Sequence, residues 1–158
     1  MPATFQTVLR TFFALAALAL LLPTAAPAGV TRAESSLLRE INSARIAHGL
    51  HPLVFDAHLE RAAQAHTSEM IQTNVFAHGA FASRLLQFDV AARVAGENIA
   101  WGTGVRGSAH AIVAAWLASP EHRANLLGPS FRRVGVGALI RRFHGFARVH
   151  VVTTDFAG

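Results

Sequence analysis

The absence of cysteine constrains the fold of this chain more than any other feature of its sequence. Without thiols the chain forms no disulfide and offers no thiolate nucleophile, and it could bind a metal only through His, Asp or Glu. Its 158 residues correspond to about one domain once a leader is subtracted. We therefore expect one hydrophobic core that is held together by packing.

The N-terminal segment has the layout of a secretory signal peptide. An apolar run at residues 12–22 follows Arg10, and residues 26–28 read Ala-Pro-Ala, which fits an A-x-A cleavage site. The run is shorter than the roughly twenty residues that span a bilayer. We predict a signal peptide at residues 1–28 and a mature domain at residues 29–158 that is secreted or periplasmic. Because a single arginine precedes the run, an uncleaved N-terminal anchor is the alternative.

All basic charge comes from arginine, and the formal net charge is +5. Arginine does not titrate in the ordinary pH range, so a high isoelectric point here is a poor indicator of nucleic-acid binding, which we do not expect. The pairs Arg132-Arg133 and Arg141-Arg142 place much of the charge in the C-terminal third. We interpret it as a solvated basic face, and the alternative is peripheral attraction to an anionic lipid or glycan surface.

Helical periodicity is clear in the first half of the mature chain. Apolar residues recur at three- and four-residue steps over residues 34–48, and again from the N-cap residue Asp56 to residue 72. His66 falls on the apolar face of the second helix, so we expect it among core residues. A third helix is predicted after Ser108.

The remaining segments predict a long loop and a hairpin. Residues 73–107 lose periodicity and contain five glycines, which indicates a loop-rich connection. Ser119 and Pro120 begin a short helical turn. Residues 134–140 and 147–154 alternate or run apolar like β-strands, and we expect them to pair as an antiparallel hairpin.

Four stretches in this order resemble the CAP superfamily of cysteine-rich secretory, antigen 5 and pathogenesis-related proteins, in its bacterial SCP-like branch. They are Ile41-Asn42 with Arg45, Gly49, Pro52-Leu53, Asp56 and Leu59; Phe76-Ala77-His78; the run from Gly96-Glu97-Asn98 to Trp101-Gly102; and residues 116–127 followed by Val134-Gly135-Val136-Gly137. The resemblance implies an α+β fold, an α/β/α sandwich in which helices flank a small, mainly antiparallel sheet.

The resemblance also implies a surface cleft with two histidines and two acidic residues. The matching residues are His78, Glu97 and His122, whereas Ser119 stands where the second acidic residue is found in eukaryotic members. Glu121 could partly replace that residue. The further residues expected to line the cleft are Asn98, Trp101, Ser119, Glu121 and Arg123. The family's ending is altered here, and Asp155 adds a charge near the end of a strand.

Two histidines and a carboxylate are ligands that Zn²⁺ accepts, and such a site leaves a position open for water or another ligand. Only two neutral imidazoles would be firm donors, so we expect zinc to bind weakly, and we expect no organic cofactor. An alternative for Glu97 is to hold the backbone N–H groups of its loop. We read Asn98 and Asn125 as braces of loop backbone, and Ser119 as the cap of the following turn.

Two functions follow from these features. The first, which we favour, is a non-enzymatic binding module for a lipid-like, glycan or protein ligand. The second is a metal-assisted hydrolase of peptide or cell-envelope substrates in which Glu97 or Glu121 acts as the base. A serine hydrolase is less consistent with the sequence, since there is no G-x-S-x-G motif. We expect a monomer.

Overall fold

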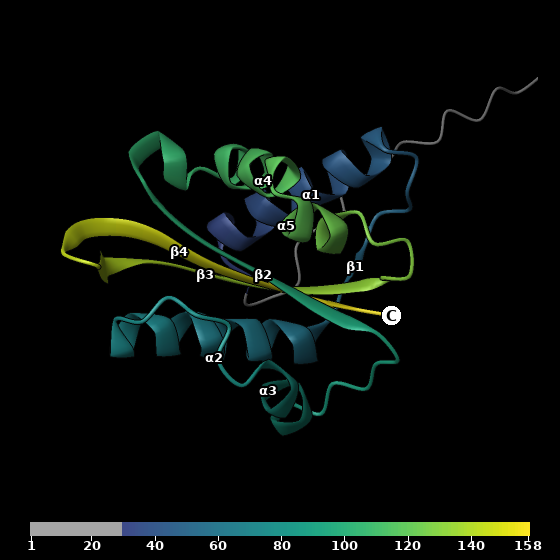
Figure 1. The fold of residues 1–158 in the computed structure, drawn as a ribbon, viewed down its shortest axis with the longest axis horizontal. Helices are drawn as coiled ribbons and strands as arrows, with labels where there is room; N and C mark the ends of the chain where they lie inside the picture. Colours follow the sequence, from purple (N-terminus) through teal and green to yellow (C-terminus); the bar gives the residue numbers. More distant parts are fainter. Residues whose placement is uncertain (1–29) are drawn as a thin grey trace, which may run out of the picture.

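The computed structural model describes residues 30–158, so the predicted signal peptide lies outside the described residues. A four-stranded sheet lies between two helical layers, with α1, α4 and α5 on one face and α2 and α3 on the other (Figure 1). The helices are α1 Arg32–Ala47, α2 Ala57–Thr73, α3 Phe81–Gln87, α4 Ala109–Ala118 and α5 Pro120–Leu126, with a 3₁₀ turn η1 at Gly104–Gly107. The α+β sandwich expected from the sequence is confirmed. Within residues 30–158, no helix combines the length and apolarity that crossing a bilayer requires.

The helices predicted from periodicity are present, and their caps explain where they begin. Thr31 and Glu34 form a reciprocal capping box at the start of α1, which places its first residue before the predicted one. The Asp56 side chain accepts hydrogen bonds from two backbone N–H groups of α2, and Ser108 caps α4. The predicted starts of α2 and α4 are therefore confirmed.

The sheet has the strand order β1-β3-β4-β2. Its strands are β1 Val54–Phe55, β2 Ala95–Thr103, β3 Arg133–Phe143 and β4 Phe146–Ala157. The predicted hairpin is formed by β3 and β4, which pair antiparallel, and β2 pairs antiparallel with the other edge of β4. The short β1 pairs in parallel with β3. The expectation of a mainly antiparallel sheet is thus confirmed.

The expectation that residues 73–107 form a loop-rich connection is wrong, because they contain α3 and the whole of β2. The strand was missed because it carries buried polar residues on both faces, Glu97 toward α2 and Asn98 toward α5, so the alternation of apolar and polar residues is absent. Helix α3 has seven residues and no side-chain cap at Ala80, which leaves little signal in the sequence.

Glycines in β3 allow α2 to lie directly on the sheet. A Cβ atom at Gly135 would come within 2.0 Å of the Leu59 carbonyl carbon, and one at Gly137 within 2.5 Å of the Ala63 carbonyl oxygen. Leu59 and Ala63 are fully buried by this contact. The close approach brings the α2 side chains within reach of the polar groups on β2 and β4.

Candidate functional site

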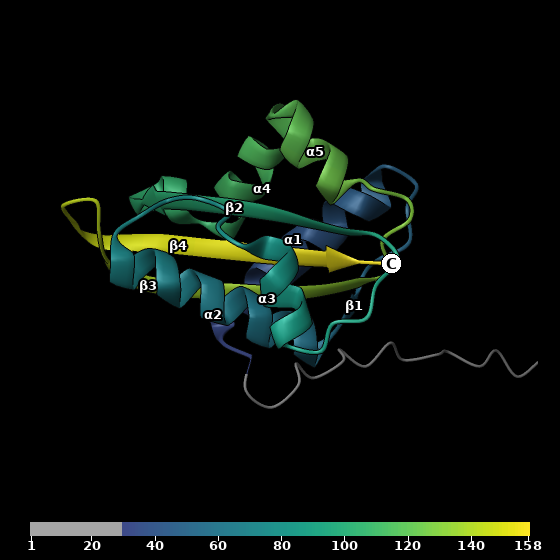
Figure 2. The ribbon, with the colours of Figure 1, turned by 60° about the horizontal axis from the view of Figure 1, so that its bottom comes forward.

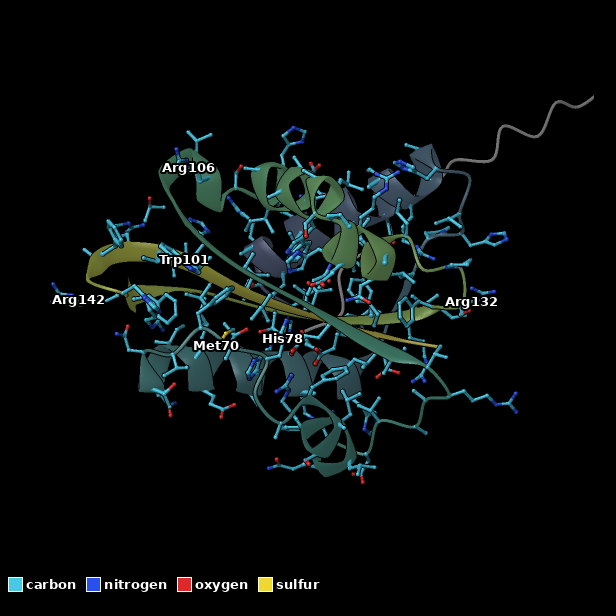
Figure 3. All side chains as sticks on the ribbon, viewed as in Figure 1. Met70, His78, Trp101, Arg106, Arg132 and Arg142 are labelled. Carbon is cyan, nitrogen blue, oxygen red and sulfur yellow. The ribbon has the colours of Figure 1, made fainter. Side chains whose placement is uncertain are left out.

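Glu97 is the centre of the polar cluster that the sequence singled out. Its side chain is 2% exposed and points to the α2 and α3 side of the sheet. Oε1 lies 2.7 Å from His78 Nδ1, and Oε2 is ion-paired with Arg84 of α3. His78, in the segment between α2 and α3, lies on this same side of the sheet (Figure 3). Both oxygens of the carboxylate are therefore already bound by cationic or proton-donating side chains.

His66 of α2 packs next to this cluster. It is 2% exposed, and its Nε2 lies 2.9 Å from the Ala77 carbonyl oxygen, to which it donates, and 3.9 Å from Glu97 Oε2. Nδ1 is 3.1 Å from the exposed Glu69 carboxylate. Burial lowers the pKa of His66, and the bond to Glu69 opposes that change. His66 thus fixes the backbone next to His78, and its place among core residues agrees with the sequence.

Asp155 on β4 is paired directly with Glu97 in the β2–β4 register, so the two carboxyl groups lie on the same face of the sheet. Asp155 is completely buried, and neither of its oxygens has a hydrogen-bond partner among residues 30–158. Burial and the charge of Glu97 raise the pKa of Asp155 well above its ordinary value. Burial raises the pKa of Glu97 to about 7, against the opposing charge of Arg84. The pair therefore retains a proton near neutral pH.

His122 approaches the cluster from α5, on the other side of the β2 edge. Its Nδ1 lies 2.8 Å from the Ser119 hydroxyl. Burial, and then the charge of His78, lower the pKa of His122. Ser119 occupies the N-cap position of α5, as predicted, but its side chain makes no capping hydrogen bond and contacts the histidine instead. The serine thus orients the His122 ring where eukaryotic relatives are expected to carry a carboxylate.

Two asparagines tie β2 to α5. Asn98 Nδ2 donates to the His122 carbonyl oxygen at 2.9 Å, and Asn125 Nδ2 donates to the Glu97 carbonyl oxygen at 3.0 Å and to Asn98 Oδ1 at 3.1 Å. A Cβ at Gly96 would lie 2.7 Å from Asn125 Oδ1, so the glycine permits this approach. The asparagines brace a strand against a helix, rather than a loop.

A model of the cysteine-rich secretory protein family, CAP, matches residues 38–156, about three quarters of the chain. The chain belongs to the CAP family. Its resemblance to the bacterial SCP-like branch is supported by two curated relatives from Bacillus subtilis. The uncharacterized protein YkwD is 34% identical over 119 residues, covering 72% of this chain and 45% of YkwD. The uncharacterized membrane protein YlbC is 36% identical over 112 residues, covering 68% of this chain and 32% of YlbC. The chain thus spans less than half the length of either relative.

Two solved structures have a similar fold. An extracellular protein containing an SCP domain from Bacillus anthracis aligns with a TM-score of 0.66 at 29% identity, over 78% of this chain and 39% of that one. An outer surface protein from Borrelia burgdorferi aligns with a TM-score of 0.63 at 23% identity, over 77% of this chain and 90% of that one. At these identities the second comparison supports the fold alone.

In this CAP domain three of the other residues that were expected to line a cleft lie away from the Glu97 side chain. Glu121 and Arg123 are exposed on α5. Trp101 lies four residues along β2 from Glu97, about 13 Å at the usual strand rise, and packs against aromatic side chains of the β3–β4 hairpin. Arg84, which is 7% exposed, was not singled out from the sequence. The sequence could have indicated Arg84 in one way: a glutamate that is buried, as Glu97 is, needs a cationic partner.

The residues that the resemblance assigned to a cleft offer a metal few free donors. Among residues 30–158, no three His, Asp or Glu side chains are arranged to hold a metal ion. Arg84 and His78 already bind the Glu97 oxygens, and the Arg84 guanidinium would repel a cation there. Glu97 is therefore not free to act as a ligand, and the imidazoles of His78 and His122 are the donors that remain for a metal.

Proposed function

We propose that this CAP domain is an exported, non-enzymatic binding module whose ligand is a lipid-like molecule with an acidic head group. Export is supported by the predicted signal peptide, and by the Bacillus anthracis relative, which is described as an extracellular protein. The observation that carries the ligand class is an apolar cavity on the face of the sheet opposite Glu97.

The cavity has a volume of about 360 Å³, within the range of small-molecule sites. It lies between α1, the start of α4 and the sheet. Its lining comprises Arg32, Ala33, Ser36 and Leu37, then Gly107, Ser108, Ala109 and Ile112, and Ala138, Ile140, His150 and Val152. Most of these side chains are apolar, which suits an alkyl chain better than a glycan, because a glycan would leave hydroxyl groups without partners. The exposed Arg32 guanidinium is available to a carboxylate or phosphate head group.

The hydrolase alternative receives less support from the site. A general base needs a carboxylate that is free to accept a proton from water, and both Glu97 oxygens are held by His78 and Arg84. Glu121, the other candidate base, is exposed and adjacent to His122 in the sequence.

Filling the cavity is expected to weaken ligand binding. Ala109→Phe adds a ring inside the lining, whereas Ala124→Phe makes the same change at an exposed position of α5 outside it. The exported protein is titrated with a fluorescent long-chain fatty acid. Ala109→Phe should bind it at least about tenfold more weakly than the wild type. Ala124→Phe should bind it as the wild type does. Binding by Ala109→Phe at wild-type affinity would contradict the proposal.

Zinc binding at His78 and His122 is a separate prediction, and it is expected to be weak and reversible, with two imidazoles as the main donors. Calorimetric titration of the wild type should give a binding heat that disappears in His78→Ala and in His122→Ala. The affinity should fall below about pH 6, where imidazoles become protonated. If both variants bind zinc as the wild type does, the cleft is not a metal site.

A further inference from the structure

The β3–β4 hairpin projects beyond the helical layers at one end of the molecule (Figures 1 and 2). Aromatic and basic residues are exposed at this end. We define the hairpin-end surface by six exposed residues from β2, η1 and the hairpin: Trp101, Val105, Arg106, Arg141, Arg142 and Phe146. Trp101, Arg106 and Arg142 lie together at this end, and Arg132 lies at the opposite end (Figure 3). None of these residues takes part in the Glu97 cluster.

The apolar part of this surface is exposed and held in place. Trp101 is 38% exposed, Phe146 52% and Val105 86%. The Trp101 ring stacks on His144, with centroids 5.7 Å apart and planes at 10°, and lies 6.1 Å from the Phe146 ring. It also meets the buried Phe143 edge to face at 6.1 Å. The aromatic side chains are thus anchored to the core and would lose little conformational entropy on binding a partner.

The charged residues at this end of the molecule are all basic. Residues 101–106 and 140–150 contain four arginines, the fourth being Arg148, and no Asp or Glu. All four arginines are exposed, and in the described part of the chain none of them forms an ion pair. Such a surface complements a partner that is anionic and extended.

We propose that the hairpin-end surface docks this protein on an anionic phospholipid bilayer. Trp and Phe side chains insert at the boundary between head groups and acyl chains, while arginines contact lipid phosphates. Each arginine near an anionic surface strengthens binding about fivefold. A second copy of this chain is a poor occupant, because a twofold contact would place four arginines against four arginines. A soluble anionic glycan would use the arginines but would leave Val105 and Phe146 without apolar contact.

Sedimentation of the exported protein with two kinds of vesicle tests this proposal. Vesicles of phosphatidylcholine with phosphatidylglycerol should bind the protein, with an affinity that falls as salt is added, and vesicles of phosphatidylcholine alone should not. The double variant Arg106→Gln/Arg142→Gln should bind the anionic vesicles roughly 30-fold more weakly. The matched control Arg39→Gln/Arg93→Gln removes the same charge from exposed positions elsewhere and should bind as the wild type does.

Fluorescence gives an independent readout. Trp116 is buried and Trp101 is exposed, so quenching by brominated acyl chains reports insertion of Trp101. Quenching should occur on anionic vesicles and fall strongly in Phe146→Ser. Equal binding to both vesicle types, equal losses in both double variants, or binding to a soluble anionic polysaccharide without vesicle binding would each overturn the proposal.

Discussion

Replacing Arg45 with alanine is expected to lower the free energy of unfolding by about 3–5 kcal/mol. Arg45 lies on α1, is 1% exposed, and its guanidinium donates to four backbone carbonyl groups. They are those of His51 at 3.0 Å, Leu126 at 2.9 Å, Gly128 at 3.1 Å and Phe131 at 3.4 Å. A single side chain thus satisfies acceptors from the segment after α1, the end of α5 and the segment before β3.

The effect is large because alanine would leave these acceptors without a donor. The guanidinium has no acidic partner among residues 30–158, and its charge is balanced by the carbonyl dipoles alone. Burial lowers the pKa of Arg45, but an arginine stays charged at neutral pH. Each buried carbonyl group left unpaired costs about 1–3 kcal/mol, and the truncated side chain also leaves a cavity.

Thermal unfolding measures this directly. A domain of this size should lose roughly 10–20 °C in melting temperature in Arg45→Ala. Arg45→Lys keeps the positive charge but lacks the planar set of guanidinium donors. Its melting temperature should lie between those of Arg45→Ala and the wild type. Arg39→Ala on the same helix removes an exposed arginine and should change stability by less than about 0.5 kcal/mol. If Arg45→Ala melts within about 2 °C of the wild type, the four hydrogen bonds do not contribute as expected.

Elements with a repeating apolar face could be predicted from the sequence, and elements built around polar residues could not. The face of α1 that carries Leu37 and Ile41 is the buried face, and both residues are at most 2% exposed. Strand β2 has the opposite character, since Glu97 and Asn98 point to opposite faces and both are buried. Their burial depends on partners from α3 and α5, which lie elsewhere in the sequence.

The contacts within the Glu97 cluster could not be predicted from the sequence either. The resemblance to the CAP family selected His78, Glu97 and His122, but the contact between Glu97 and Asp155 depends on strand register. A slip of one residue would send Asp155 to the other face of the sheet, so no local pattern could reveal the pair. From the sequence, Asp155 could be recognised only as an additional charge near the end of a strand.

Replacing Asp155 with asparagine is expected to stabilise the protein at pH 7.5, by an amount that shrinks as the pH is lowered. Asparagine has nearly the same shape, is neutral without binding a proton, and can donate a hydrogen bond toward Glu97. In the wild type, the buried pair must instead retain a proton or hold two negative charges close together.

The direction of the pH dependence follows from the raised pKa values. Both carboxyl groups have a folded-state pKa above the unfolded value of about 4, and that of Glu97 is about 7. Between these pH values the folded protein binds more protons than the unfolded chain, so the contribution of the pair to stability is present at about pH 4 and is lost as the pH rises to about 7. His66 acts in the opposite direction, because its lowered pKa makes folding less favourable below about pH 6.5.

Comparing the two proteins removes the contribution of His66, since both contain it. The stability difference between Asp155→Asn and the wild type should fall by about 1.4 kcal/mol for each pH unit, or about 2–3 kcal/mol between pH 7 and pH 5. Urea unfolding at several pH values measures this difference. Asp89→Asn, at an exposed position, should leave the profile of the wild type unchanged. A difference that stays constant from pH 5 to pH 7 would mean that the pair carries no extra proton in the folded state, and that Arg84 alone balances two ionised carboxylates.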